Sequence, residues 1–301
     1  MQHSSRGIAL KIGATLAFGL QYVGIKLAGN VPVGEVVFFR AFFALIPLAL
    51  LATQTVGVAA MVRTTRPGLH LVRAAVGSSG MFLNFAALKL LPLADITAFG
   101  FVQPIFAVVL AAAVLKETVG PYRGGAVAIG FAGVLLMVAP QDGIAGIAAH
   151  GLSAGAGLAL TGALASAFVV VYIRQMSATE KSETIVFYFM SFCAALGALT
   201  MLAWRVPLSV GQAAWLTAAG VIGGIGQIAM TFSYRYAEPS LLAPFDYSAM
   251  IWAVAFGFAI FGEAPALLVL AGAAVVTAAG VFIAVREHRI GRELASRIEA
   301  V

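Results

Sequence analysis

The sequence predicts an all-α integral membrane protein with ten transmembrane helices, arranged as two inverted five-helix repeats around a central cavity. Three observations lead to this fold class. The 301 residues are 61% hydrophobic and only 10% charged, with a mean hydropathy of +1.00, whereas soluble domains carry about 25% charged residues. Apolar runs of about 20 residues, the length that a helix needs to cross a bilayer, recur along the chain. The second half of the chain also repeats the first.

Turn and charge signals separate the apolar runs into ten candidate spans. They lie at about 8–28, 34–53, 68–88, 94–115, 120–139, 151–174, 183–203, 211–233, 239–261 and 265–285. The sequence lacks the alternating pattern of barrel strands, about ten residues long. The spans are therefore expected to be helices, which satisfy their own backbone hydrogen bonds in lipid.

The repeat is clearest between residues 89–117 and 235–263, which align without a gap at an offset of 146. The first two spans match the sixth and seventh at an offset of 148, which places Glu35 on Glu183. These matches predict a first five-helix repeat at 1–140, a linker at 141–150, a second repeat at 151–285 and a basic cytoplasmic tail at 286–301. Because five is odd, the second repeat enters the membrane from the opposite side. Inverted repeats are typical of secondary transporters.

The net charge of +6 reflects membrane topology rather than a nucleic-acid site. If both termini are cytoplasmic, most of the Lys and Arg residues between or beside the spans fall on the cytoplasmic side. The positive-inside rule therefore favours this orientation. The basic and apolar residues of the C-terminal tail are expected to lie along the anionic inner surface.

Several segments resemble the drug/metabolite transporter superfamily, specifically its ten-span EamA-type members. They are FFRAFFALIPLAL at 38–50, the run from LVRAAVGSSG to LKETVG at 71–120, GFAGVLLMVAP at 130–140, FGEAP at 261–265 and AAGVFIAV at 278–285. The resemblance covers essentially all of 8–285 and implies a central cavity, with the fifth and tenth spans at the periphery. Similar bacterial proteins export amino acids and related metabolites, while others take up nucleotide-like metabolites or extrude drugs.

Arg40 and Asp246 are the charges that lie deepest within apolar runs. A charge inside the membrane is costly and is a functional hypothesis by default. From their positions in their spans, Arg40 is expected nearer the outer surface and Asp246 nearer the inner one, so a direct pair between them is not expected. The expected neighbours are Glu35, Lys89 and Asp95 around Arg40, and Arg174, Glu183, Arg235 and Glu238 around Asp246.

Other candidates for the cavity wall are polar or aromatic residues within spans. Pockets for small ligands are mostly apolar with a few placed polar groups. The candidates are Tyr22, Asn84, Phe99, Phe101, Gln103, Tyr188, Gln227, Tyr247 and Trp252, with Pro104 and Pro244 as gating or hinge positions. The structural alternatives also stand, because small-residue faces and uncharged amides often only join helices, and aromatic side chains also face lipid or the interface.

The function that these features predict is alternating-access export of amino acids or closely related small metabolites across the bacterial inner membrane. The alternatives are import of a nucleotide-like metabolite, extrusion of drugs or cations, and, in a different class, a channel. An enzyme is not expected, because the four histidines lack metal-ligand spacing and no catalytic motif is present. We therefore expect no cofactor, and as partners a small-molecule substrate and the lipid bilayer, with monomer and homodimer both open.

Overall fold

The computed structural model describes residues 2–103, 105–107, 109–110, 121–150, 153–176, 179–204, 206–236, 242 and 245–299. These residues form helices and short connections, and no strand occurs among them. They include five apolar helices of membrane-spanning length and five shorter apolar helices, and one of these lies in each of the ten predicted spans. The predicted fold class is confirmed.

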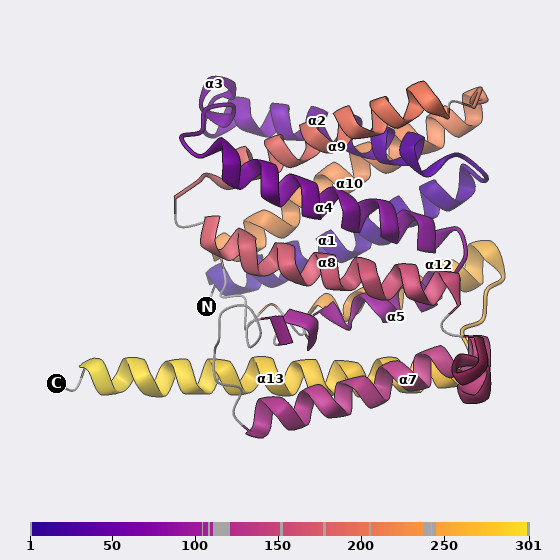
Figure 1. The fold of residues 1–301 in the computed structure, drawn as a ribbon. Coiled ribbons are helices and arrows are strands. Elements are labelled where there is room, and N and C mark those ends of the chain that lie inside the picture. The colour runs from indigo at the N-terminus through magenta and orange to yellow at the C-terminus, as the bar shows by residue number, and fades with distance from the viewer. Residues whose placement is uncertain are drawn as a thin grey trace.

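Figure 1 shows the arrangement of the described helices. The first half contains α1 (Gln2–Leu27), α2 (Val33–Gln54), α3 (Val58–Met61), α4 (Pro67–Leu88), α5 (Leu93–Gly100) and α7 (Pro121–His150). The second half contains α8 (Ala154–Met176), α9 (Ser182–Ala203), α10 (Val210–Tyr236), α12 (Ser248–Phe261) and α13 (Leu267–Glu299). Proline begins α4, where its missing N–H costs nothing. Gly262 ends α12 in the left-handed conformation, at φ 65°, which glycine adopts without strain.

The contacts between helices keep the same pattern when the two halves are exchanged. Exchange converts the α1–α10 contact into the α8–α4 contact, and the α2–α10 contact into the α9–α4 contact. It also converts α1–α12 into α8–α5, while α2–α9, α5–α12 and α7–α13 each map onto themselves. The large contacts therefore join helices of opposite halves, as two interlocked inverted repeats require.

Helices α7 and α13 lie side by side along one face of the bundle (Figure 1). Small residues allow their close approach, because a Cβ on Gly133 would lie 2.8 Å from the carbonyl oxygen of Gly272. Close packing through small residues is the usual way in which helices associate in lipid. These two helices are the fifth and tenth spans, which the sequence places at the periphery.

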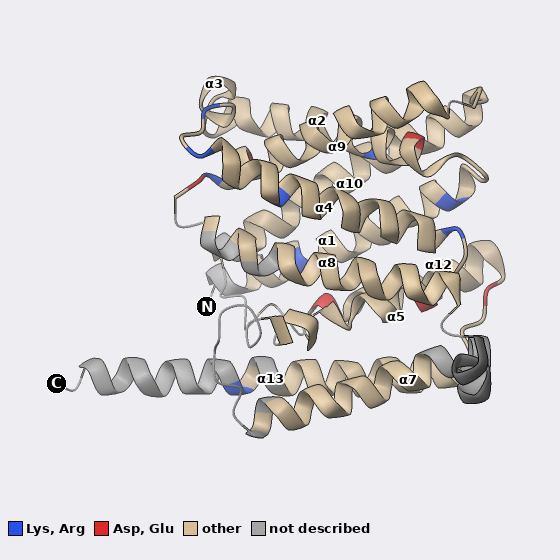
Figure 2. Ribbon diagram, viewed as in Figure 1, with Lys and Arg blue, Asp and Glu red and all other residues tan. Residues whose placement is uncertain are grey.

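Charged side chains are sparse along the described helices (Figure 2). Helix continues into the two segments that the sequence assigns to the linker and the tail. Residues 141–150, expected as a linker, continue α7 to His150, and the tail expected from residue 286 continues α13 as one helix to Glu299. The helix of residues 121–150 continues past Pro140, Gly143 and Gly146, although proline and glycine are the least favourable residues in a helix.

Candidate functional site

Two arginines from different helices are buried in the interior of the bundle. Arg40 lies on α2 about 10 Å from the start of that helix, and Arg73 lies on α4 about 9 Å from its start, at the usual rise per residue. Both helices have 22 residues and succeed each other in antiparallel fashion, so the two side chains approach from opposite ends of the bundle. Each is only 6% exposed.

The two guanidinium groups reach the same part of α9. Nη1 of Arg40 lies 2.8 Å from the sulfur of Met190, and the guanidinium carbon of Arg73 lies 3.6 Å from the centre of the Phe189 ring. Cys193, one turn further along α9, is close enough to both arginines to interact with them electrostatically. These three residues occupy the middle of α9, which runs from Ser182 to Ala203. The two cations therefore contact adjacent residues of α9.

Neither arginine forms an ion pair with a carboxylate in the part of the chain that the structure describes. The groups that influence them electrostatically are Cys193, Tyr22 and, for Arg73, the like charge of Arg40. Nε of Arg40, and Nε and Nη1 of Arg73, are buried without a hydrogen-bond partner. Buried donors of this kind are costly, because they have lost water without gaining an acceptor. The sequence predicts Glu35 and Asp95 as acidic neighbours of Arg40, and neither forms an ion pair with it.

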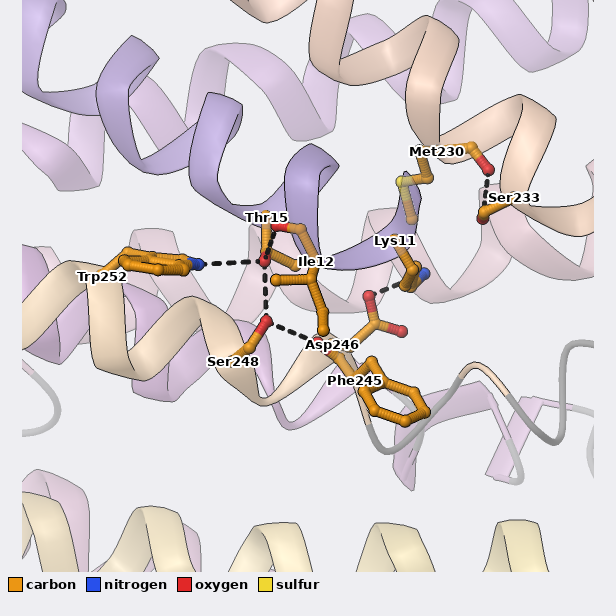
Figure 3. A network of polar contacts seen from close by, with 9 residues as sticks. All are labelled: Lys11, Ile12, Thr15, Met230, Ser233, Phe245, Asp246, Ser248 and Trp252. Atoms are coloured by element: carbon orange, nitrogen blue, oxygen red, sulfur yellow. Dashed lines mark hydrogen bonds and ion pairs between the residues drawn. The ribbon is translucent and has the colours of Figure 1, made fainter. Parts of the chain in front are cut away.

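A second polar cluster joins α1 to α12 (Figure 3). Lys11, fully buried on α1, pairs with Asp246 at 2.7 Å, and the Asp246 side chain remains 44% exposed. Nearby, the hydroxyl oxygens of Thr15 and Ser248 lie 2.7 Å apart, and the Trp252 indole N–H donates to Thr15 Oγ1 at 3.2 Å. Asp246 therefore has an ion-pair partner that was not among the expected ones, and Trp252 is fixed by α1.

Charged contacts also close the far end of the bundle, where α1 ends. Lys26 pairs with Glu263, and the second carboxylate oxygen of Glu263 accepts a hydrogen bond from the backbone N–H of Leu93 at 3.0 Å. Glu35 accepts from the backbone N–H of Val206 at 2.8 Å. The Lys89 ammonium donates to the backbone carbonyl of Val31 in the same region. Burial lowers the pKa of Lys89 from its ordinary value, and the nearby Glu35 carboxylate acts in the opposite direction.

Tyr188 directly precedes Phe189 on α9, and its side chain contacts the start of α4 and the connection before it. Its hydroxyl donates to the backbone carbonyl of Val62 at 2.8 Å, and its ring packs on His70 with centroids 4.6 Å apart. His70 is 3.3 Å from Glu180, which also accepts from Thr64 at 2.9 Å. These contacts join α4 and α9 to the connections before them, so the predicted wall position of Tyr188 has a packing role.

The remaining predicted residues divide by what they touch. Asn84 donates to the carbonyl of Gly80 in its own helix at 2.9 Å and lies against Gly162 of α8. Phe101 and Tyr247 pack edge to face at 4.9 Å. Phe99 is fully buried, Tyr22 packs edge to face on Phe85, and Gln103 and Gln227 are half-buried. Pro104 and Pro244 lie outside the described residues. No group of three metal-binding side chains occurs among the residues that the structure describes.

Comparison of the sequence with known protein families identifies the family of this chain. The model of the EamA-like transporter family matches the chain twice, over residues 5–139 and 153–286. The chain belongs to the EamA-like transporter family. A pseudopaline exporter of Pseudomonas aeruginosa is 28% identical over 91% of this transporter and 94% of its own length. A riboflavin transporter of Rhizobium johnstonii is 30% identical over 93% and 91%. A solved crystal structure shares the fold, with 20% identity, a TM-score of 0.65 and coverage of 95% of this chain and 99% of the other.

Sequence reasoning missed two of the buried cations of this EamA-like transporter. Arg73 and Lys11 were both assigned to the cytoplasmic side as topology signals, because each lies within a few residues of the start of its span. The structure buries both of them inside the bundle. For Arg73 one signal was available, since Gly77 lies one helical turn later on the same face and leaves room for a long side chain. Nothing in the sequence links Lys11 to Asp246.

Proposed function

We propose that this EamA-like transporter exports amino acids or closely related small metabolites that carry a carboxylate. The observation that supports the proposal is the buried pair Arg40 and Arg73, which has no acidic partner among the described residues. A carboxylate accepts two parallel hydrogen bonds from a guanidinium, so a substrate carboxylate completes this site. Transporters of inverted-repeat design bind substrate near the midplane.

Alternating access follows from the way in which the halves meet. Residues 1–140 and 151–285 form the two repeats, and their contacts are exchanged by the repeat symmetry. The α1–α12 region carries the Lys11–Asp246 pair toward one end and the Lys26–Glu263 pair at the other. Opening at one end breaks the pair there while the other pair stays closed, which gives access from one side at a time. Pro104 and Pro244 provide the hinges, because proline frees backbone carbonyls within a helix.

The direction of transport is outward across the bacterial inner membrane, with both termini in the cytoplasm. The distribution of Lys and Arg residues supports this orientation, and α1 begins and α13 ends at the same end of the bundle (Figure 1). The relative that exports pseudopaline supports the outward direction. The Lys11–Asp246 pair then belongs to the cytoplasmic gate and the Lys26–Glu263 pair to the outer gate.

A second candidate is a planar aromatic metabolite, since a riboflavin transporter is 30% identical to this chain. The edge-to-face pair Phe101 and Tyr247, contributed by opposite halves, supplies aromatic surface for such a ligand. Aromatic faces bind planar rings by offset stacking or edge contact. The candidate would be favoured over the first if a flavin competes for transport and amino acids do not.

The experiment that separates these functions is counterflow in proteoliposomes that contain the full-length protein. Vesicles preloaded with unlabelled amino acid should accumulate the labelled amino acid, with and without a pH gradient, and the accumulation should saturate. Arg40→Gln and Arg73→Gln should each reduce it strongly. A channel would equilibrate substrate without counterflow. Absence of counterflow for every amino acid and related carboxylate would show that the proposed function is wrong.

A further inference from the structure

The double positive charge of Arg40 and Arg73 restricts the substrate more narrowly than the requirement for one carboxylate does. Arg40 and Arg73 place two like charges in the buried interior, against the adjacent residues Met190 and Phe189 of α9. Arginine stays charged in proteins, so both positive charges persist. A zwitterionic amino acid has no net charge, and a single carboxylate neutralises one of the two. A ligand with two negative charges neutralises both.

The donors that lack partners are distributed over both arginines. Arg40 has Nε free and its Nη1 against a thioether sulfur, which is a weak acceptor. Arg73 has Nε and Nη1 free. Each guanidinium therefore retains donors for its own anionic oxygen pair, and bidentate recognition of carboxylate or phosphate is the geometry for which arginine is suited.

The surrounding residues hold both groups in place. The Phe189 ring covers one face of the Arg73 guanidinium at 3.6 Å, and Gly77 leaves the space that Arg73 occupies, because a Cβ there would lie 2.5 Å from Nη1. A cation on an aromatic face gains electrostatic attraction without using its in-plane donors. The ring contact therefore leaves the in-plane donors Nε and Nη1 of Arg73 without a hydrogen-bond acceptor in this buried position.

The site occurs once in the chain, although the fold is repeated. At the repeat offsets of 148 and 146, Arg40 corresponds to Tyr188 and Arg73 to Ala219. Tyr188 is engaged with Val62 and His70, and alanine has no charge. The second half therefore offers no equivalent pair of cations.

We infer that Arg40 and Arg73 form one binding site for a substrate that presents two negative charges to them, either on the two carboxylates of an acidic amino acid or on the phosphate of a phosphate monoester. The inference rests on the proposed function for the transport cycle, and it narrows the substrate from carboxylates in general to dianions. Two guanidinium groups would recognise a dicarboxylate and a phosphate monoester in the same way, so the test includes ligands of both kinds.

The test compares ligand pairs in which one member carries an anionic group that its neutral partner lacks. Thermal unfolding of the full-length protein in neutral detergent at constant ionic strength gives the affinities for L-aspartate and L-asparagine, L-glutamate and L-glutamine, and glycerol phosphate and glycerol. The expected result is that at least one charged member binds at least tenfold more tightly than its neutral partner. The wild-type protein alone gives this result, so it does not depend on whether a variant folds.

The variants then assign the preference to the two arginines. Arg40→Gln and Arg73→Gln should each reduce the tenfold preference to threefold or less. Arg66→Gln is the matched control, because Arg66 is exposed just before α4, and it should keep the wild-type preference. Preference retained in both Arg40→Gln and Arg73→Gln would overturn the assignment.

The outcomes distinguish this inference from the proposed function. If counterflow of amino acids occurs and aspartate binds no better than asparagine, nor any other charged member better than its partner, the dianion site is wrong and the proposed function stands. If only glycerol phosphate binds, and Arg73→Gln abolishes that binding, the dianion site stands and the amino-acid substrate is wrong. If no ligand of any pair binds or exchanges, both are wrong.

Discussion

Replacing Gly77 with alanine disturbs the arginine site without removing a charge. The new Cβ would lie 2.5 Å from Nη1 of Arg73 and 2.8 Å from Cε2 of Phe189. Ordinary contacts between nonbonded heavy atoms lie at about 3.5–4.0 Å, so the guanidinium and the ring must each move by about 1 Å. The substitution therefore displaces the arginine edge that is proposed to meet the substrate and the aromatic face that supports it.

The magnitude of the effect differs for stability and for binding. Overpacking in a filled interior costs about 1–3 kcal/mol, and alanine gains about 1 kcal/mol over glycine within a helix. Stability should therefore fall by only about 0–2 kcal/mol. Binding loses one charge-assisted hydrogen bond, which contributes about 1.5–3 kcal/mol. That range corresponds to a decrease in substrate affinity of between about tenfold and about a hundredfold.

The assay measures the KM for exchange in proteoliposomes together with the unfolding midpoint in detergent. Gly77→Ala should raise KM about tenfold or more and leave the midpoint within a few degrees of wild type. Gly68→Ala is the control in the same helix, since a Cβ there meets no atom within 4 Å, and its KM should not change. A wild-type KM for Gly77→Ala in a folded protein would refute the placement of substrate at Arg73.

Two further predictions concern the contacts between the halves. Trp252→Phe removes the hydrogen bond to Thr15. The loss of about 1 kcal/mol of stability should lower the unfolding midpoint by about 2 °C, and the rate of exchange should not change. Slower exchange at an unchanged midpoint would instead place the indole in the substrate path. Glu263→Gln removes the half-buried ion pair with Lys26, which contributes about 1 kcal/mol. Cys193 is the one cysteine of the sequence, so its labelling by an impermeant maleimide applied from outside reports opening on that side. The labelling rate should increase about fivefold. An unchanged labelling rate would show that this pair does not hold the outer gate.

The positions of the spans could be predicted from the sequence because lipid imposes a simple constraint. Each crossing needs about 20 apolar residues, and every backbone group within it must find a partner in its own segment. The ends of α7 and α13 could not be predicted in the same way. Hydropathy marks where the membrane stops, and a helix need not end there. Residues 141–150 and 286–299 continue as helix beyond that point.

The candidate site was only half predictable, because depth can be estimated along one helix but partners lie on others. Arg40 was recognised from its place inside an apolar run. Its true neighbours, Met190 and Arg73, lie on α9 and α4, and no spacing in the sequence indicates that these helices meet at those residues. Tyr188 was likewise placed only by its position in its span, and its contact with His70 could not be predicted from the sequence.

The location of the arginine pair connects binding to movement. Arg40 and Arg73 belong to the first half of the chain, whereas Met190 and Phe189, which hold the two guanidinium groups, belong to α9 in the second half. Any rotation of one half against the other must therefore change the contacts of both cations. A substrate dianion that neutralises the pair stabilises the arrangements in which both guanidinium groups still reach it. A ligand can shift a conformational equilibrium only by its difference in affinity for the two states, and a site built across the moving boundary is where such a difference arises most directly.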